Sequence, residues 1–135
     1  MHKSLAFAVL TFALASVPAA GHHSFAMFDQ TKTITLSGTV EGFEFINPHS
    51  WLHMTVIDES GATATWSFEM GSVGQLASDG WNRDTIAAGE EVAITFHPLE
   101  DGSNGGQFRS LAFADGRSLC QGGAGSTACT DNPNF

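Results

Sequence analysis

Apolar and polar residues alternate along several short segments of this chain, and a period of two is typical of strands with one buried face. Ile34, Leu36 and Val40 alternate with threonines and a serine. After Gly42 the bulky residues fall in the opposite phase. A change of phase at a glycine is what a β-bulge produces. We therefore expect a long first strand that bends near Gly42.

A hairpin with a definite register is predicted over residues 50–70. Two alternating runs flank Glu59-Ser60-Gly61, a three-residue turn with glycine where a left-handed conformation is needed. If Asp58 pairs with Ala62, apolar residues face one another on one side and polar residues on the other. The predicted pairs are Met54 with Trp66 and Leu52 with Phe68 inside, and His53 with Ser67 and Trp51 with Glu69 outside.

The remaining segments predict a short helix and two further strands. Ser72 can cap a helix that ends at Gly80. Residues 92–96 and 107–114 read as strands, and Ser118-Leu119 can add a short edge. Three strands, a helix and two strands is the order of an OB-type barrel. We expect a mainly β fold, a small five-stranded OB-like barrel with one short helix between strands 3 and 4, with a small β-sandwich as the alternative.

The first 21 residues have the order of an export signal. Lys3 precedes an apolar run from Leu5 to Val17, and the small residues after Pro18 suit a signal peptidase. The run is shorter than the ~20 residues of a membrane-spanning helix. We expect a periplasmic or secreted protein of a Gram-negative bacterium. The predicted parts are a cleaved signal (1–21), a barrel domain (22–119) and a flexible tail (120–135).

Charge, cysteines and the lack of catalytic motifs narrow the classes of function. Four basic and fourteen acidic residues follow the signal, a formal charge of −10 that disfavours nucleic acid. An isolated cysteine pair in an exported protein, here Cys120 and Cys129, predicts a disulfide. Whether it forms within one chain or between two stays open. The chain has no metalloprotease, P-loop or dinucleotide-binding motif. The sequence therefore favours a binding protein over a conventional enzyme.

Histidines are the main chemical signal, and His22 and His23 lie at the predicted mature terminus. If cleavage follows Gly21, the α-amine and ring of His22 form a chelate. If it follows Ala19, His22 becomes the third residue of a square-planar Cu(II) or Ni(II) site. Both alternatives predict a metal site, with copper as the cofactor.

His49 and His53 share one face of the predicted hairpin, with Trp51 between them. Four residues along a strand separate them by about 13 Å. One of them together with His22 and His23 is therefore the simpler site. Glu69 is expected to orient the ring of His53 from the second shell, and Trp51 is expected to cap the site.

Other interpretations stay open beside a periplasmic copper-binding protein. A non-catalytic adaptor could recognise a glycan or an envelope protein through exposed tryptophans, Trp51 and Trp81. A third hypothesis is a small copper oxidase. Phe25 and Phe28 could instead cover Trp51 and carry the terminal histidines towards His53. Met54 and Met70 fall on inward positions and suit the core, whereas Met27 is free to act.

Five short motifs between Gly21 and Leu119 bear a resemblance to known proteins. Their combination resembles a family of short exported bacterial proteins known only as a domain of unknown function, which implies no particular activity. The cysteine-bearing tail departs from it. A weaker resemblance is to small periplasmic copper barrels, but alternation places Met54 on the opposite face to His53. The motifs are His22–Phe25, Asn47–Trp51, Trp66–Glu69, Gly80-Trp81 and Asp115–Arg117.

Overall fold

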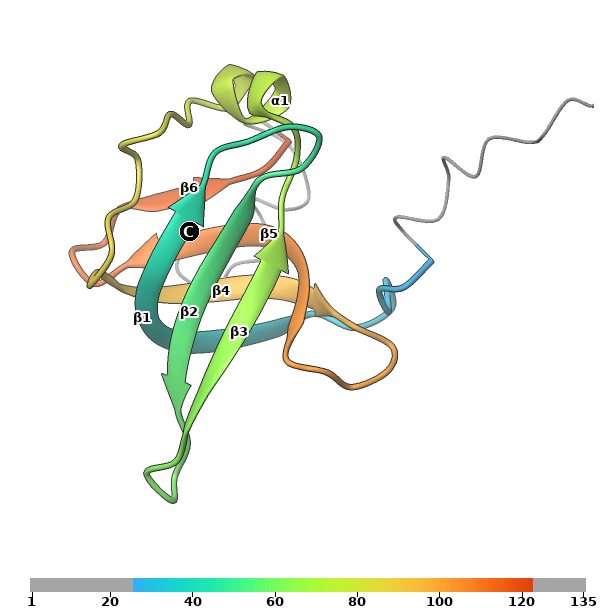
Figure 1. The fold of residues 1–135 in the computed structure, drawn as a ribbon, viewed down its shortest axis with the longest axis vertical. Coiled ribbons are helices and arrows are strands. Elements are labelled where there is room, and N and C mark those ends of the chain that lie inside the picture. Colours follow the sequence, from blue (N-terminus) through green and yellow to red (C-terminus); the bar gives the residue numbers. More distant parts are fainter. Residues whose placement is uncertain (1–25, 123–135) are drawn as a thin grey trace, which may run out of the picture.

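Five strands close into a barrel because β1 pairs along both of its halves and β3 meets β5 (Figure 1). The computed structural model describes residues 26–122. The antiparallel order β3-β2-β1-β4-β5 is closed by a parallel pairing of β3 with β5, and β6 extends β5. The predicted mainly β, five-stranded OB-like barrel is confirmed. Its elements are β1 (Ile34–Glu44), β2 (Trp51–Ile57), β3 (Thr63–Glu69), α1 (Val73–Ser78), β4 (Glu91–Pro98), β5 (Gly105–Phe113) and β6 (Ser118–Cys120).

The predicted bend of β1 is a bulge at Glu41. The register with β2 shifts between Val40 and Gly42, so Glu41 is the extra residue. Before the shift Val40 points into the core, and after it Phe43 packs against the core. The outer face is likewise reset, which brings Glu44 opposite Trp51. The phase change seen in the sequence is therefore confirmed.

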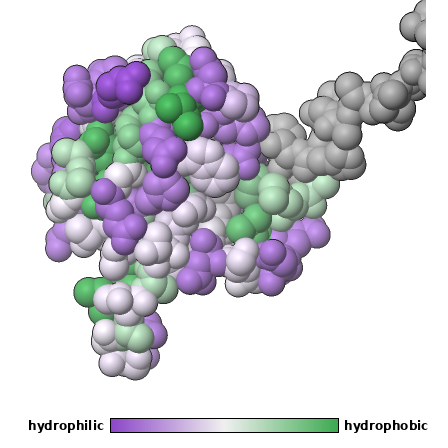
Figure 2. All heavy atoms as spheres, viewed as in Figure 1, coloured by the Kyte–Doolittle hydropathy of each residue, from purple (hydrophilic) through white to green (hydrophobic). Residues whose placement is uncertain are grey.

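The hairpin of β2 and β3 has the predicted register. Met54 lies opposite Trp66 inside the barrel, and His53 lies opposite Ser67 outside it. The turn is held by the Asp58 carboxylate, which accepts hydrogen bonds from Ser60 and from the Ala62 backbone. These bonds, that of the Ser60 hydroxyl first, lower the pKa of Asp58. Figure 2 shows that this hairpin projects from the body of the barrel.

The core is an aromatic cluster in which Trp81 takes part. Its indole is 2% exposed, lies edge-on to Phe108 at 5.4 Å and donates a hydrogen bond to the Cys120 carbonyl. The expectation that Trp81 is exposed for a partner is therefore wrong, because the loop after α1 turns it inward. Phe68 and Phe96 belong to the same core, with tilted rings whose centroids lie 4.9 Å apart. Burying each such ring contributes roughly 1.5–3 kcal/mol.

The helix α1 begins and ends as the sequence predicts. The Ser72 hydroxyl accepts a hydrogen bond from the Gln75 backbone, and Gly80 follows the helix with a φ of 91°. Leu76 is the buried residue that holds α1 against the barrel. Within residues 26–122, no helix is long and apolar enough to cross a membrane.

Closure of the barrel requires a glycine at position 105. A Cβ atom there would lie 2.5 Å from the Ser67 carbonyl oxygen, a backbone atom of the neighbouring strand. We expect Gly105→Ala to lower the free energy of unfolding by about 1–3 kcal/mol, the usual cost of overpacking. Urea denaturation measures this change.

Gly74 of α1 provides the matched control, since no atom lies within 4 Å of the Cβ that alanine would add. Gly74→Ala should leave stability unchanged or raise it by about 0.5–1 kcal/mol, because alanine favours the helix. Equal losses in both variants would contradict the steric explanation.

Candidate functional site

A pocket of about 410 Å³ lies where β2 begins and β3 ends. We call it the His49 pocket. It collects side chains from five separate parts of the chain, including the segment before β1 and the residue after β6. It is the one place where a histidine, a carboxylate, a thioether and three amides share a described cavity. Its lining is Phe28, Pro48, His49, Glu69, Met70, Gly71, Ser72, Gln75, Gln107 and Gln121.

A tight imidazole–carboxylate pair occupies this pocket. The Nδ1 atom of His49 lies 2.5 Å from Oε1 of Glu69, whose side chain is only 12% exposed. An ionised carboxylate only accepts hydrogen bonds, so Nδ1 carries the proton. Among the described residues, no partner contacts Nε2 of His49, which therefore keeps its lone pair for a ligand. A histidine oriented by a carboxylate in this way is typical of metal sites.

The loop that carries His49 is fastened to the connection between β3 and α1. The Asn47 side chain accepts a hydrogen bond from the Val73 backbone at 3.1 Å, at the start of α1. Ser50 is fully buried, and its backbone bonds to Met70 and Gly71. The Asn47-Pro48 peptide is cis. Two of the motifs that resemble the family, Asn47–Trp51 and Trp66–Glu69, thus meet at the His49 pocket.

The segment before β1 forms another wall of the His49 pocket. It runs antiparallel to the start of the β4–β5 loop, through hydrogen bonds of Asp29 with Pro98 and of Glu100 with Met27. Between them Phe28 is 5% exposed and bridges to Leu99. The expectation that Phe28 covers Trp51 is therefore wrong: Phe28 lies beside His49 in the pocket. Phe25 lies outside the described residues.

Several predicted residues lie outside the part of the chain that the structure describes. They include both histidines of the mature terminus and one of the two cysteines, so neither the terminal ligands nor the disulfide has a geometry here. Within residues 26–122, no group of three or more His, Cys, Asp or Glu side chains is arranged to hold a metal ion. These residues are the signal (1–21), His22, His23, Phe25 and Cys129.

His53 is placed differently from the prediction. Its Nδ1 lies 2.9 Å from the Ser67 hydroxyl, and its Nε2 lies 3.3 Å from a Glu44 carboxylate oxygen. The expectation that Glu69 orients His53 is wrong, because Glu69 bonds to His49 from the turn before β2. Both nitrogens of His53 are engaged, so this histidine links β1, β2 and β3 instead of presenting a free ligand atom.

Sequence reasoning missed Glu44 and Gln107. The bulge at Glu41 shifts the β1–β2 register by one residue, and this shift is what sets Glu44 opposite Trp51. Gln107 reaches the pocket through the parallel pairing of Glu69 with β5. No local sequence pattern predicts the parallel pairing of β3 with β5, because the two strands are far apart in the chain.

Trp51 is half-buried on the outer face, at the start of β2. It lies in register between Glu44 of β1 and Glu69 of β3. Among the described residues, no aromatic ring and no cation contacts its indole. Trp66 and Trp81, in contrast, both pack against phenylalanines. Trp51 is therefore the tryptophan that is available to a partner.

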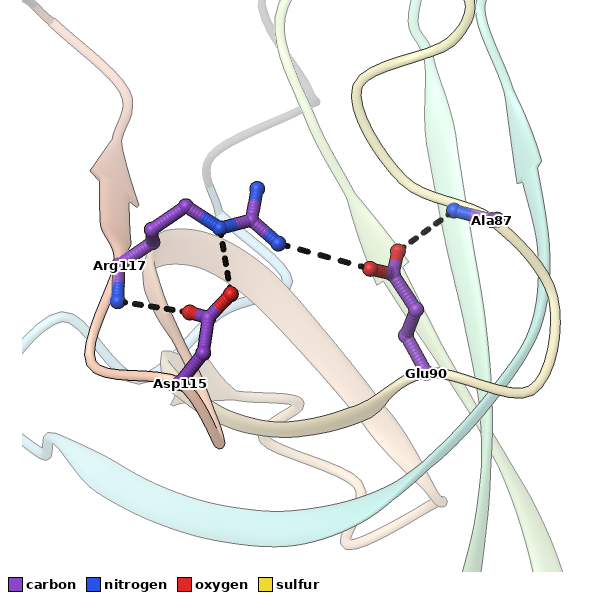
Figure 3. A network of polar contacts seen from close by, with 4 residues as sticks. All are labelled: Ala87, Glu90, Asp115 and Arg117. Atoms are coloured by element: carbon purple, nitrogen blue, oxygen red, sulfur yellow. Dashed lines mark hydrogen bonds and ion pairs between the residues drawn. The ribbon is translucent and has the colours of Figure 1, made fainter.

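The Asp115–Arg117 motif has a structural role. Figure 3 shows the Arg117 guanidinium between two carboxylates, 2.7 Å from Asp115 and 3.6 Å from Glu90. Glu90 in turn accepts a hydrogen bond from the Ala87 backbone, and the guanidinium lies over the Phe113 ring. The hydrogen bond from Arg117 lowers the pKa of Asp115. The motif joins the β5–β6 turn to the loop before β4.

Fold and pocket together define a small OB-type barrel with a histidine–carboxylate pocket beside its N-terminal segment. The chain belongs to a family of unknown function, DUF6152, whose model matches residues 10–109. This confirms the resemblance read from the five motifs. Comparison with functionally curated proteins and with solved structures gives no match.

Asp29 forms an ion pair with Lys32 in the segment before β1, and this pair can be tested by titration. The Lys32 ammonium, 2.7 Å away, and the Thr31 hydroxyl lower its pKa to about 2 from an ordinary 3.8. A lowered carboxyl pKa contributes stability that is present above the ordinary value and is lost as the pH falls through about 2. We expect Lys32→Met to raise the pKa of Asp29 towards 3.8. NMR titration of the Asp29 carboxyl carbon measures this change. An unchanged midpoint would show that Lys32 does not hold this anchor.

Proposed function

We propose that the mature protein is an exported metal-binding protein, suited above all to copper, whose ligands are His49 and the N-terminal His22 and His23. The observation that supports this most is the His49–Glu69 pair, with its 2.5 Å contact and the unpartnered Nε2, inside a pocket walled by Phe28. A single imidazole does not hold a metal ion firmly, and the described residues contain no group of three His, Cys, Asp or Glu side chains that would hold one. The remaining ligands therefore come from the terminus.

Chain length permits this arrangement. Phe28 is buried in the wall of the pocket, and it lies six positions after His22. Six residues span at most about 20 Å when fully extended. The pairing of residues 27–29 with residues 98–100 keeps the anchor of this segment beside His49. The terminal amine and imidazoles thus stay within reach of the pocket.

Ligand chemistry favours copper among the divalent metals. An α-amine and imidazoles form a nitrogen-rich ligand set, which suits Cu(II). Among the divalent metals, Cu(II) lies at the maximum of the Irving–Williams order of affinity. Met70 lines the same pocket and supplies a thioether, a ligand that suits Cu(I). When bound, the ion would be held by the His49 imidazole, and Glu69 would fix the tautomer of that ring. The acidic exterior of the protein attracts cations as well.

The test uses protein secreted through its own signal and purified without an N-terminal tag. Intact mass identifies the first residue, and Cu(II) titration with EPR measures the number and the type of ligands. We expect one axial, nitrogen-rich site per chain. Glu69→Gln removes the carboxylate that orients the His49 ring and should weaken copper binding by about 10–100-fold. The proposal would be wrong if copper bound at less than one ion per chain and Glu69→Gln left its affinity unchanged.

Two histidine variants separate His49 from general effects of surface imidazoles. His49→Ala should lower copper affinity at least as much as Glu69→Gln. His53→Ala is the matched control and should leave affinity within about threefold, because both of its ring nitrogens are already engaged. One extra glycine before the first residue should also disrupt the site, since it displaces the amine from its chelate. If His53→Ala lowered copper affinity more than His49→Ala, the ligand would be His53 and not His49.

A further inference from the structure

Carboxylates surround Trp51 on the outer face of β1, β2 and β3, and these strands contain no basic residue. We call this surface the Trp51 face; it comprises Glu41, Glu44, Trp51, His53 and Glu69. Figure 2 shows hydrophilic side chains across the strands that face the viewer in Figure 1. The basic residues of the described chain all lie elsewhere: Lys32, Arg83, Arg109 and Arg117.

The position of Trp51 suits a cation. Glu44 and Glu69 are its direct cross-strand neighbours, and such neighbours have Cβ atoms about 4.5–5.5 Å apart. The face of an indole attracts ammonium and guanidinium groups through its quadrupole. A cation over this ring would therefore meet the exposed Glu44 carboxylate on one side, while Glu69 on the other side is 12% exposed and bonds to His49. Among the described residues, no cation and no other ring stacks on the Trp51 indole.

The two carboxylates of β1 are held in place before any partner arrives. Glu41 accepts hydrogen bonds from the hydroxyls of Thr55 on β2 and Thr65 on β3. Glu44 lies 3.3 Å from the His53 ring, yet its side chain remains 54% exposed. Groups that are already ordered lose less entropy on binding. The Trp51 face thus combines preorganised negative charge with an open aromatic surface.

We propose that the Trp51 face docks a basic segment of a partner protein, with an arginine or lysine side chain over Trp51 and against the exposed Glu44 carboxylate. Charge complementarity selects this occupant, because the same carboxylates attract a cation and repel a phosphate backbone. The interaction requires neither His49 nor the N-terminal histidines. It can therefore be tested without metal, although Glu69 belongs to both surfaces.

The test measures binding of a fluorescent peptide of alternating arginine and glycine to the full mature protein, by fluorescence anisotropy. A peptide with citrulline in place of arginine has the same shape without the charge. We expect the arginine peptide to bind about tenfold tighter than the citrulline peptide, a difference of one to two cation–π and ion-pair contacts. The preference should shrink as salt is raised.

Variants locate the binding. Trp51→Ala and Glu44→Gln should each weaken the arginine peptide by about fivefold or more. Glu91→Gln removes the same charge from exposed β4, outside the Trp51 face, and should change affinity less than twofold. If the circular dichroism spectrum shows that Trp51→Ala disturbs the fold, the Glu44→Gln variant provides the test instead. The Glu44 side chain is exposed, so its replacement should leave the fold intact. The double variant His22→Ala and His23→Ala should bind the peptide normally.

Three results would overturn this proposal. The first is equal affinity for the arginine and citrulline peptides. The second is an equal loss in Glu44→Gln and Glu91→Gln, which would indicate attraction to net charge alone. The third is a neutral oligosaccharide that binds in a Trp51-dependent way while the arginine peptide does not, which would make the face a glycan platform.

Discussion

The bulge at Glu41 is the constraint on which the rest of the barrel depends. It lets one strand pair with β4 through its first half and with β2 through its second half, because the extra residue sharpens the bend and twist. Without that bend β3 would not reach β5, and the sheet would stay open. The same residue resets the phase of the outer face, so that Glu41 and Glu44 both point outward beside β2.

Glu69 connects the two surfaces that the fold builds around this bend. It fixes the His49 ring on one side and lies in register with Trp51 on the other. Its side chain is largely buried, so its charge acts in an environment where hydrogen bonds are stronger than in water. The His49 pocket and the Trp51 face are consequently contiguous, although one presents a free imidazole nitrogen and the other an indole between carboxylates.

Hydrogen bonds of the chain itself decide which histidine is available. His53 sits within a strand, where cross-strand neighbours engage both of its nitrogens. His49 lies in the turn before that strand, and the hydrogen bonds of Asn47 and Ser50 fasten this turn to the start of α1. One nitrogen is thereby left open towards the cavity. Two histidines that look equivalent in the sequence thus have different chemistry.

The sequence by itself determined the local structure of this protein. The hairpin register, the bulge near Gly42, the caps of α1 and the turn at Gly61 were all readable, because each depends on a few consecutive residues and on backbone sterics. Tertiary structure alone decided the pairing of His49 with Glu69, the burial of Trp81 and the place of Phe28 beside the pocket. Those contacts join segments distant in the chain, and only closure of the barrel, through packing of its common core, brings such segments together.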